Sequence, residues 1–146
     1  AEKLMVRTGW TGPFINVTRD RRGRGGGLCA ILGEKFEAGA KESPLRLGSP
    51  DKTPKTKFLG YSRKGNPTFM YEVDGVRFEQ TATGHPAKKG LTLGFSAGNP
   101  KSDVFYLIDS KDLVVSSTAG KWHPDKGYVQ IPAKEASEFF ISIERK

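Results

Sequence analysis

The stretch K-F-L-G-Y-S-R-K-G-N-P-T-F-M-Y-E-V-D-G-V-R-F-E-Q-T-A-T, residues 57–83, decides the fold class of this chain. Its Asp74-Gly75 dipeptide favours a two-residue hairpin turn, because both central residues of a type I′ turn need a positive φ. A second turn signal, Gly65-Asn66-Pro67, separates two further runs rich in aromatic and β-branched residues. The stretch therefore predicts three antiparallel strands punctuated by two turns.

The side chains around Asp74-Gly75 support this pairing. Successive side chains of a strand point to opposite faces, so apolar residues that alternate with polar ones gather on one face. Folding about the turn therefore places two apolar pairs on one face and a charge-matched pair on the other. The pairs are Val73 with Val76, Tyr71 with Phe78, and Glu72 with Arg77.

The rest of the chain continues the pattern of short apolar runs separated by turns. Such runs, repeated about every 8–12 residues, are typical of a β-sandwich or barrel. Residues 28–32 fit either a strand or one helical turn, residues 133–137 fit one helical turn, and residues 33–56 are mostly a long surface connection. Strands are predicted at residues 4–7, 14–17, 45–47, 91–95, 104–108, 113–117, 128–131 and 139–143.

Length and composition agree with one globular domain. The 146 residues are 36% hydrophobic, which is too apolar for a disordered chain, and the 18 glycines and 9 prolines suit many turns. No run of 18 apolar residues is present, so no transmembrane helix is expected. We expect a single antiparallel β-sandwich or open barrel over residues 1–146, loop-rich and basic at 1–56 and strand-dense at 57–146.

Cysteine and histidine usage limits the possible cofactors. The single cysteine, Cys29, excludes an internal disulfide, a zinc site built from cysteines and the C-x-x-C-H attachment of a covalent haem. His85 and His123 each precede a proline in an expected loop, with no suitably spaced carboxylate nearby. They are weak candidates for a non-covalent cofactor, and solvated loop histidines are the plainer interpretation.

The net charge of +8 is unevenly distributed. Residues 1–70 hold 14 Lys and Arg against 6 Asp and Glu, while residues 71–146 hold 10 of each. A one-sided basic excess favours an acidic partner, which can be a protein, polysaccharide, lipid headgroup or nucleic acid. A soluble basic protein with no such partner is the alternative.

The densest part of this excess is the glycine- and arginine-rich segment at residues 18–27. Glycines let backbone N–H groups converge on an anion, and arginines can donate forked hydrogen bonds to it. No P-loop or dinucleotide-binding pattern surrounds the segment, so a close backbone crossing with solvated arginines stays open as the structural alternative. The candidate anion- or partner-binding residues are Arg19, Arg21, Arg22, Arg24, Gly25 and Gly26, together with Trp10.

Signals of catalysis are absent from the sequence: there is no G-x-S-x-G motif and no recognisable carboxylate pair. Tryptophans and tyrosines could form a platform that stacks on sugars, although core or edge positions are the commoner role of such residues. Interleaved aromatic and basic residues would suit single-stranded nucleic acid, but the aromatics lie apart from the basic segment, which disfavours that partner. The aromatics considered are Trp10, Trp122, Tyr61, Tyr71, Tyr106 and Tyr128.

A series of short motifs carries a family resemblance. In chain order these are G-W-T-G-P-F at residues 9–14, G-R-G-G-G at 23–27, F-L-G-Y at 58–61, G-N-P-T-F-M-Y at 65–71 and D-G-V at 74–76. Over residues 5–83 the order resembles a β-rich module of large membrane-bound dehydrogenase-type proteins of planctomycetes, which usually accompanies a c-type cytochrome domain. The resemblance implies an extracytoplasmic, periplasmic-type location and association with redox machinery, but it brings no active-site residue.

These observations lead to two functional expectations. The first is a non-catalytic accessory subunit that docks on a larger, acidic, haem-containing redox protein, with a neighbouring chain supplying adjacent strands. The second is a binding module for an anionic polysaccharide or similar polymer, held by Arg21, Arg22 and Arg24 with Trp10 stacked on a ring. An enzyme with an unrecognised site is a third, weaker alternative.

Overall fold

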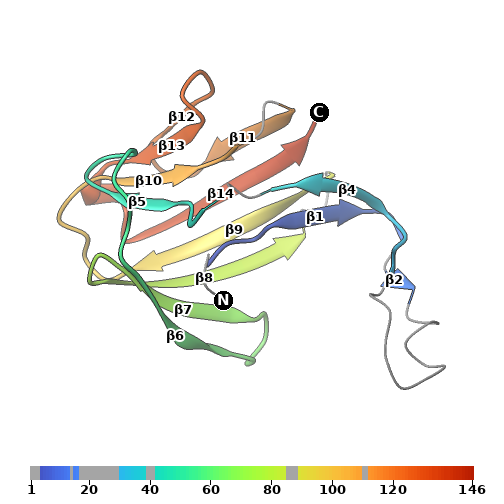
Figure 1. The fold of residues 1–146 in the computed structure, drawn as a ribbon, viewed down its shortest axis with the longest axis horizontal. Coiled ribbons are helices and arrows are strands. Elements are labelled where there is room, and N and C mark those ends of the chain that lie inside the picture. Colours follow the sequence, from blue (N-terminus) through green and yellow to red (C-terminus); the bar gives the residue numbers. More distant parts are fainter. Residues whose placement is uncertain (1–3, 14, 17–29, 39–41, 85–88, 110–111) are drawn as a thin grey trace.

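The computed structural model describes residues 4–13, 15–16, 30–38, 42–84, 89–109 and 112–146, and the strands in these ranges pair antiparallel throughout (Figure 1). Two sheets form the body of the molecule. One has six strands in the order β11-β14-β9-β8-β7-β6, and the other has four in the order β12-β13-β10-β5. The expected all-β fold of sandwich type is therefore confirmed.

The six-stranded sheet contains the predicted hairpin. Asp74 and Gly75 form its two-residue turn with φ of 49° and 83°, and the Cα partners on either side are those expected from the sequence. Arg77 lies opposite Glu72, as expected, but it forms an ion pair with Glu79, at 2.8 Å. The strands are β6 (Thr56–Ser62), β7 (Thr68–Val73), β8 (Val76–Gly84), β9 (Gly90–Ala97), β11 (Leu113–Ser117) and β14 (Glu138–Arg145).

The hydrophobic core lies between this sheet and the four-stranded one. The ring of Phe95 is stacked on Phe139 of the same sheet, with centroids 4.9 Å apart, and lies 5.4 Å from Tyr106 of the facing sheet. Rings in contact across the interior hold the two layers together by apolar burial. The facing sheet consists of β5 (Leu45–Leu47), β10 (Val104–Leu107), β12 (Lys121–His123) and β13 (Tyr128–Ile131).

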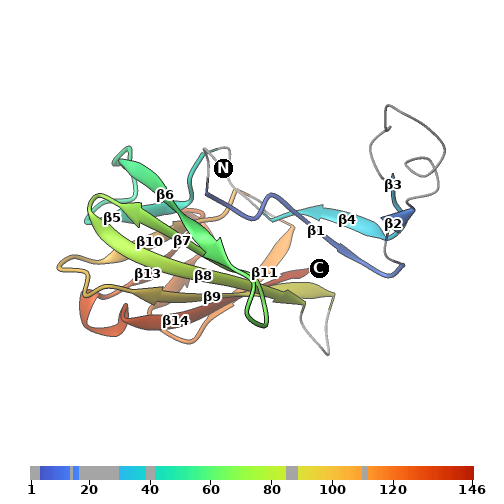
Figure 2. The same ribbon diagram turned by 90° about the horizontal axis from the view of Figure 1, so that it is seen from below.

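A third part of the fold is a ribbon that we call the arm, made of β1 (Thr8–Thr11) paired with β4 (Glu34–Glu37) and continued by β2 (Ile15–Asn16) paired with β3 (Ala30–Ile31). The arm projects beyond the sandwich (Figure 2). Phe36 attaches its base to the core, with its ring against Gly9, where a Cβ would lie 2.4 Å from the ring. Arg145 of β14 forms an ion pair with Glu34 at 2.9 Å, so the arm is also attached through charge.

The strands of the structure differ from the expected ones at three places. The first strand begins at Thr8 rather than within residues 4–7, and the strands β4 and β12 were not expected. Both unexpected strands are short, and β4 has the sequence E-K-F-E with a single apolar residue. Pairing with a neighbour, rather than burial of alternating side chains, forms such strands. The expected helical turn is present as a short 3₁₀ helix at Ala133–Glu135.

Candidate functional site

Exposed apolar side chains gather on the hairpin formed by β6 and β7. Of the seven large apolar side chains that are exposed in the described residues, four belong to this hairpin, and they are between 40% and 54% exposed. Contiguous exposed apolar surface is uncommon on soluble proteins and marks interaction sites. The four are Phe58, Leu59, Tyr61 and Phe69.

Strand geometry explains why three of these side chains are exposed together. Phe69 is two residues from the fully buried Tyr71, so both lie on the inner face of the sheet. Tyr61 is the Cα partner of Phe69, and Phe58 is the partner of Tyr71, which puts them on the same face. The inner face thus continues past the buried core as a row of uncovered aromatic rings.

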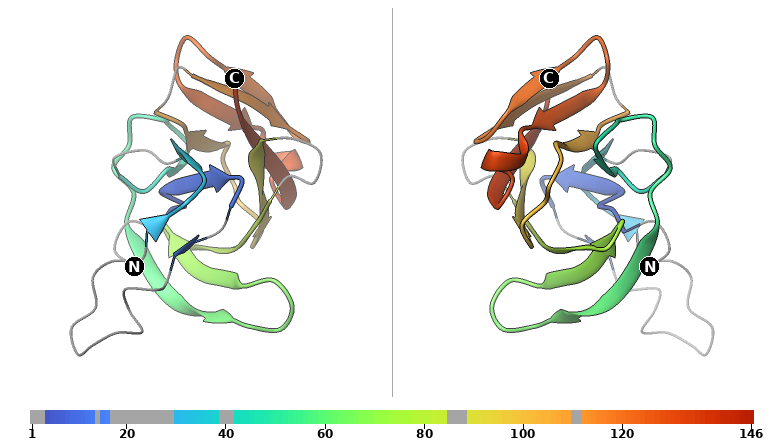
Figure 3. Two further views of the ribbon diagram at one scale, coloured as in Figure 1. Left: turned by 90° about the vertical axis from the view of Figure 1, so that its right-hand side faces the viewer. Right: turned by 90° about the vertical axis from the view of Figure 1, so that its left-hand side faces the viewer.

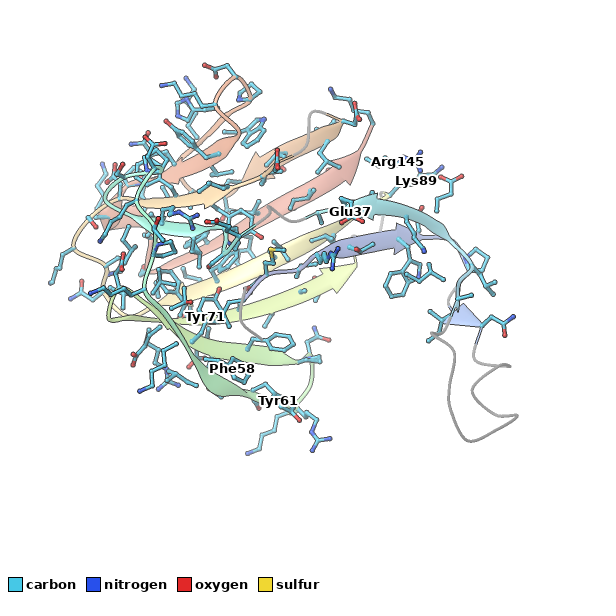
Figure 4. The ribbon with its side chains drawn as sticks, viewed as in Figure 1. Glu37, Phe58, Tyr61, Tyr71, Lys89 and Arg145 are labelled. Carbon is cyan, nitrogen blue, oxygen red and sulfur yellow. The ribbon has the colours of Figure 1, made fainter. Side chains whose placement is uncertain are left out.

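The facing sheet does not extend over this row. Its last strand, β5, contacts β7, and β6 is itself the last strand of the larger sheet. In the end-on views the β6–β7 hairpin (green) extends away from β12 and β13 (orange), at the opposite end of the molecule (Figure 3). Phe58 and Tyr61 lie along this hairpin, whereas Tyr71 lies further in (Figure 4). Six strands in one layer and four in the other therefore leave part of the inner face open.

A β-bulge shapes the open edge of β6. The pairing with β7 shifts register between Phe58 and Gly60, so Leu59 is the extra residue, and Gly60 has a φ of 145° that side chains disfavour. Bulges increase local twist and interrupt the row of free backbone groups that an added strand would need. An added strand could therefore not pair along the whole length of this edge. The side chains of the edge are more accessible to a partner than its backbone groups.

Cationic residues accompany the exposed rings. Between Asp51 and Glu72 the chain has five Lys or Arg and no Asp or Glu. The Arg63 guanidinium carbon lies 5.8 Å from the centroid of the Tyr61 ring, within cation–π distance. We call the four exposed apolar side chains and the three cations within residues 56–73 the basic aromatic hairpin, comprising Lys57, Phe58, Leu59, Tyr61, Arg63, Lys64 and Phe69. Lys57 is the Cα partner of Glu72, so it lies on the face opposite the rings.

The carboxylate of Asp74 holds the entry to this hairpin in place. The Lys55 backbone N–H donates to it at 2.9 Å, and the Lys52 ammonium lies 2.9 Å away. The hydrogen bond from Lys55, reinforced by Lys52, keeps the pKa of Asp74 below its ordinary value. The charged carboxylate therefore joins the start of β6 to the β7–β8 turn.

A second candidate site is a cavity of about 320 Å³ at the end of β5 and β10. Leu107, Ile108 and Gly127 line it together with charged side chains of both signs. Glu42, Asp109 and Lys126 are exposed at the cavity, whereas Arg46 is buried. The cavity thus combines an aliphatic wall, a buried guanidinium and exposed charges.

Arg46 has a clear structural role at this place. Its Nη1 donates to the carbonyl oxygens of Ser43 and Leu45, the latter at 3.0 Å. The Pro44 carbonyl and the Gly48 N–H form hydrogen bonds on the β10 side of β5. Because successive carbonyls of a strand point in alternate directions, those of Ser43 and Leu45 point to the opposite, free side. Burial lowers the pKa of Arg46, and the Glu42 charge opposes this effect. The guanidinium therefore takes the place of a neighbouring strand along the free edge of β5.

The structure describes only some of the candidate site residues that the sequence suggested. Arg19, Arg21, Arg22, Arg24, Gly25, Gly26 and His85 lie outside the residues that the structure describes. Trp10 is partly buried in β1 of the arm, opposite Lys35. His123 ends β12 with its ring 5.3 Å from Tyr128. Trp10 and His123 thus belong to different parts of the fold, the arm and the four-stranded sheet.

The aromatics considered for a sugar platform do not form one surface, in line with the core and edge positions that are their commoner role. Tyr71 and Tyr106 are buried in the core, and only Tyr61 of the tyrosines belongs to the exposed group. The segment at 18–27 lies outside the described residues, so its separation from the aromatics stays a prediction. In the basic aromatic hairpin, by contrast, aromatic and basic residues do lie together. This site was missed although its signal was available, since the run of five cations without an acid can be read from the sequence.

Across the described ranges no three or more His, Cys, Asp or Glu side chains come together as a possible metal site. In the same residues there is no helix with the length and apolar character needed to cross a membrane. Comparison of the chain with family models, curated proteins and solved structures gives no match.

Proposed function

We propose that this protein is a non-catalytic interaction subunit that docks on an acidic surface of a larger protein through the basic aromatic hairpin. The observation that carries the proposal is the row of uncovered rings on the inner face of β6 and β7, with Arg63 and Lys64 in the turn that joins these strands. Aromatic residues and arginine are the residue types that contribute most to protein interfaces.

The open inner face supports docking by a protein. Phe58, Tyr61 and Phe69 continue the same face that forms the core, so a partner that covers them would extend the apolar interior of the sandwich. Complementary charge around such a contact speeds association and sets its orientation, and the contribution falls as salt screens it. The proposed complex is therefore strongest at low ionic strength.

The family resemblance of residues 5–83 supports one kind of partner. On that basis we propose a haem-containing redox protein outside the cytoplasm, with this chain as an accessory subunit of a hetero-oligomer. The cationic character of the hairpin supports an acidic docking face on that partner.

Affinity copurification from the source cells tests this proposal. The wild-type protein should retain a haem-containing partner, detected by its Soret absorbance, at low salt and release it at high salt. A Phe58→Ser/Tyr61→Ser variant should lose the partner because its anchors are gone. Phe140→Ser is the matched control, since Phe140 on β14 is 42% exposed, close to the 41% of Phe58, but lies outside the hairpin. Recovery of the protein as a monomer at every salt concentration would contradict the proposal.

A second candidate function, binding of an anionic polysaccharide, is favoured by one observation. The Arg63 guanidinium over the Tyr61 ring places a cation beside a flat apolar surface, which suits a sugar ring that carries a carboxylate or sulfate. The same chemistry would also suit a single-stranded nucleic acid.

Retention on immobilised heparin and polygalacturonate distinguishes these polymers. Replacement of Lys57, Arg63 and Lys64 by Gln should reduce retention more than replacement of Arg21, Arg22 and Arg24, if the hairpin is the binding surface. Equal loss from the two triple variants would assign the binding to overall charge. Tighter binding of an oligothymidylate than of either polysaccharide would rule out the polysaccharide as the preferred ligand.

A further inference from the structure

The cavity at the end of β5 and β10 has features that capping of a strand edge does not require. Arg46 needs only its Nη1 group to bond the carbonyls of Ser43 and Leu45. The other terminal nitrogen, Nη2, lies towards Glu42, with a distance of 3.6 Å to Oε2. The same side chain also lines a cavity of about 320 Å³, which is at the lower end of the range for small-molecule sites.

The Glu42–Arg46 pair is unequal. The Arg46 side chain is 7% exposed, whereas that of Glu42 is 71% exposed. A buried guanidinium is costly unless a carboxylate pairs with it closely, and a long contact to a solvated carboxylate supplies little. A carboxylate that entered the cavity could approach Nη2 more closely and with less solvent around it. Glu42 therefore occupies a position that an external carboxylate could take.

We propose that this cavity binds a small monocarboxylate, which displaces Glu42 from Arg46 Nη2. The charge of Lys126 supports the bound anion, and the apolar part of the ligand packs on Leu107 and Ile108. This site is separate from the basic aromatic hairpin, and the proposal does not depend on the function assigned to that hairpin.

The charges around the cavity select this ligand class. Two cations, Arg46 and Lys126, are balanced by two acids, Glu42 and Asp109, so the lining has no net formal charge. The two acids repel a dianion such as phosphate about twice as strongly as a monoanion, and the one buried guanidinium balances a single negative charge. The aliphatic wall formed by Leu107 and Ile108 favours a ligand with an apolar body.

Titration of the ¹⁵N-labelled full chain with benzoate tests the proposal, with benzamide as the neutral control. Benzoate should shift the amide resonances of Ile108 and Gly127 saturably, in the millimolar range, and benzamide should not. Glu42→Gln should bind benzoate severalfold more tightly, because the competing carboxylate is removed. Lys126→Met should bind it severalfold more weakly.

Lys134→Met is the matched control for charge, because Lys134 is exposed and does not line the cavity. It should leave the benzoate affinity unchanged. These variants keep Arg46, whose loss would disturb β5 itself. Equal shifts with benzamide, an unchanged affinity in Glu42→Gln, or equal weakening in Lys126→Met and Lys134→Met would each overturn the proposal.

Discussion

At the residue scale, the turn between β7 and β8 shows how little is needed to set the register. Asp74 and Gly75 adopt positive φ, and the pairing of Tyr71 with Phe78 follows, with ring centroids 6.1 Å apart. A Cβ at Gly75 would meet no atom within 4 Å. Any cost of a side chain at this position is therefore conformational and does not come from a clash.

Gly75→Val should therefore lower the free energy of unfolding by about 1–2 kcal/mol, since a β-branched residue is strained at a φ of 83°. Urea unfolding followed by tryptophan fluorescence measures the change. Gly84→Val is the control, because Gly84 also has open space around it and lacks a positive φ. An equal loss in both variants would show that the turn conformation is not the cause.

At the element scale, the last strands of the two sheets, β6 and β5, are protected differently although they lie on the same side of the sandwich. A bulge at Leu59 interrupts the edge of β6, whereas the Arg46 side chain covers carbonyl groups of β5. Both devices limit pairing with strands of other molecules. The backbone edges are thus protected, and the feature that stays accessible to a partner is the side chains of the basic aromatic hairpin.

Arg46→Met should expose the β5 carbonyls and lower the free energy of unfolding by about 1–3 kcal/mol, because buried acceptors lose their donors. Size-exclusion chromatography should also detect concentration-dependent association, as the edge becomes available for pairing. Glu42→Gln is the control and should change stability by less than about 1 kcal/mol, since Glu42 is exposed. A stable, monomeric Arg46→Met protein would remove the edge-capping role.

At the scale of the whole molecule, two buried tyrosines of the core make the stability of the folded state depend on pH. Tyr71 donates to Gln80 Oε1 at 2.8 Å, while the hydroxyl of Tyr106 has no hydrogen-bond partner among the described residues. Burial raises the pKa of both phenols well above the ordinary value, because the charged form would lose its hydration. The folded state therefore keeps both protons after the unfolded chain has released them.

Stability should consequently fall as the pH rises above about 10, where tyrosines of the unfolded chain ionise. Each retained proton contributes about 1.4 kcal/mol per pH unit to this fall. Tyr106→Phe should make the dependence shallower by that amount, as measured by urea unfolding between neutral and alkaline pH. At pH 7 the variant should be at least as stable as the wild type, since the hydroxyl that it lacks has no described partner. An unchanged alkaline slope would contradict the role of Tyr106.

Much of the architecture could be predicted from local patterns. The Asp74-Gly75 turn, the alternation around it and the regular spacing of apolar runs each depend on residues close in the chain. These signals were sufficient for the all-β class and for the register of β7 with β8. The same patterns could not predict β4, because its partner β1 lies far away in the chain, or β12, because its three residues are too few to show an alternation.

The candidate sites depend on tertiary structure for a related reason. Tyr71 and Phe69 share one face of β7, yet one is buried and the other exposed, since the facing sheet covers only part of that face. Alternation identifies a face but carries no information about what lies opposite. The sequence alone determined the all-β class, most strands of the two main sheets, the hairpin and the cationic run. The position at which the four-stranded sheet ends decided which rings are exposed and which edge Arg46 covers. Only the tertiary structure fixes this position, because burial is set by contacts between segments far apart in the chain.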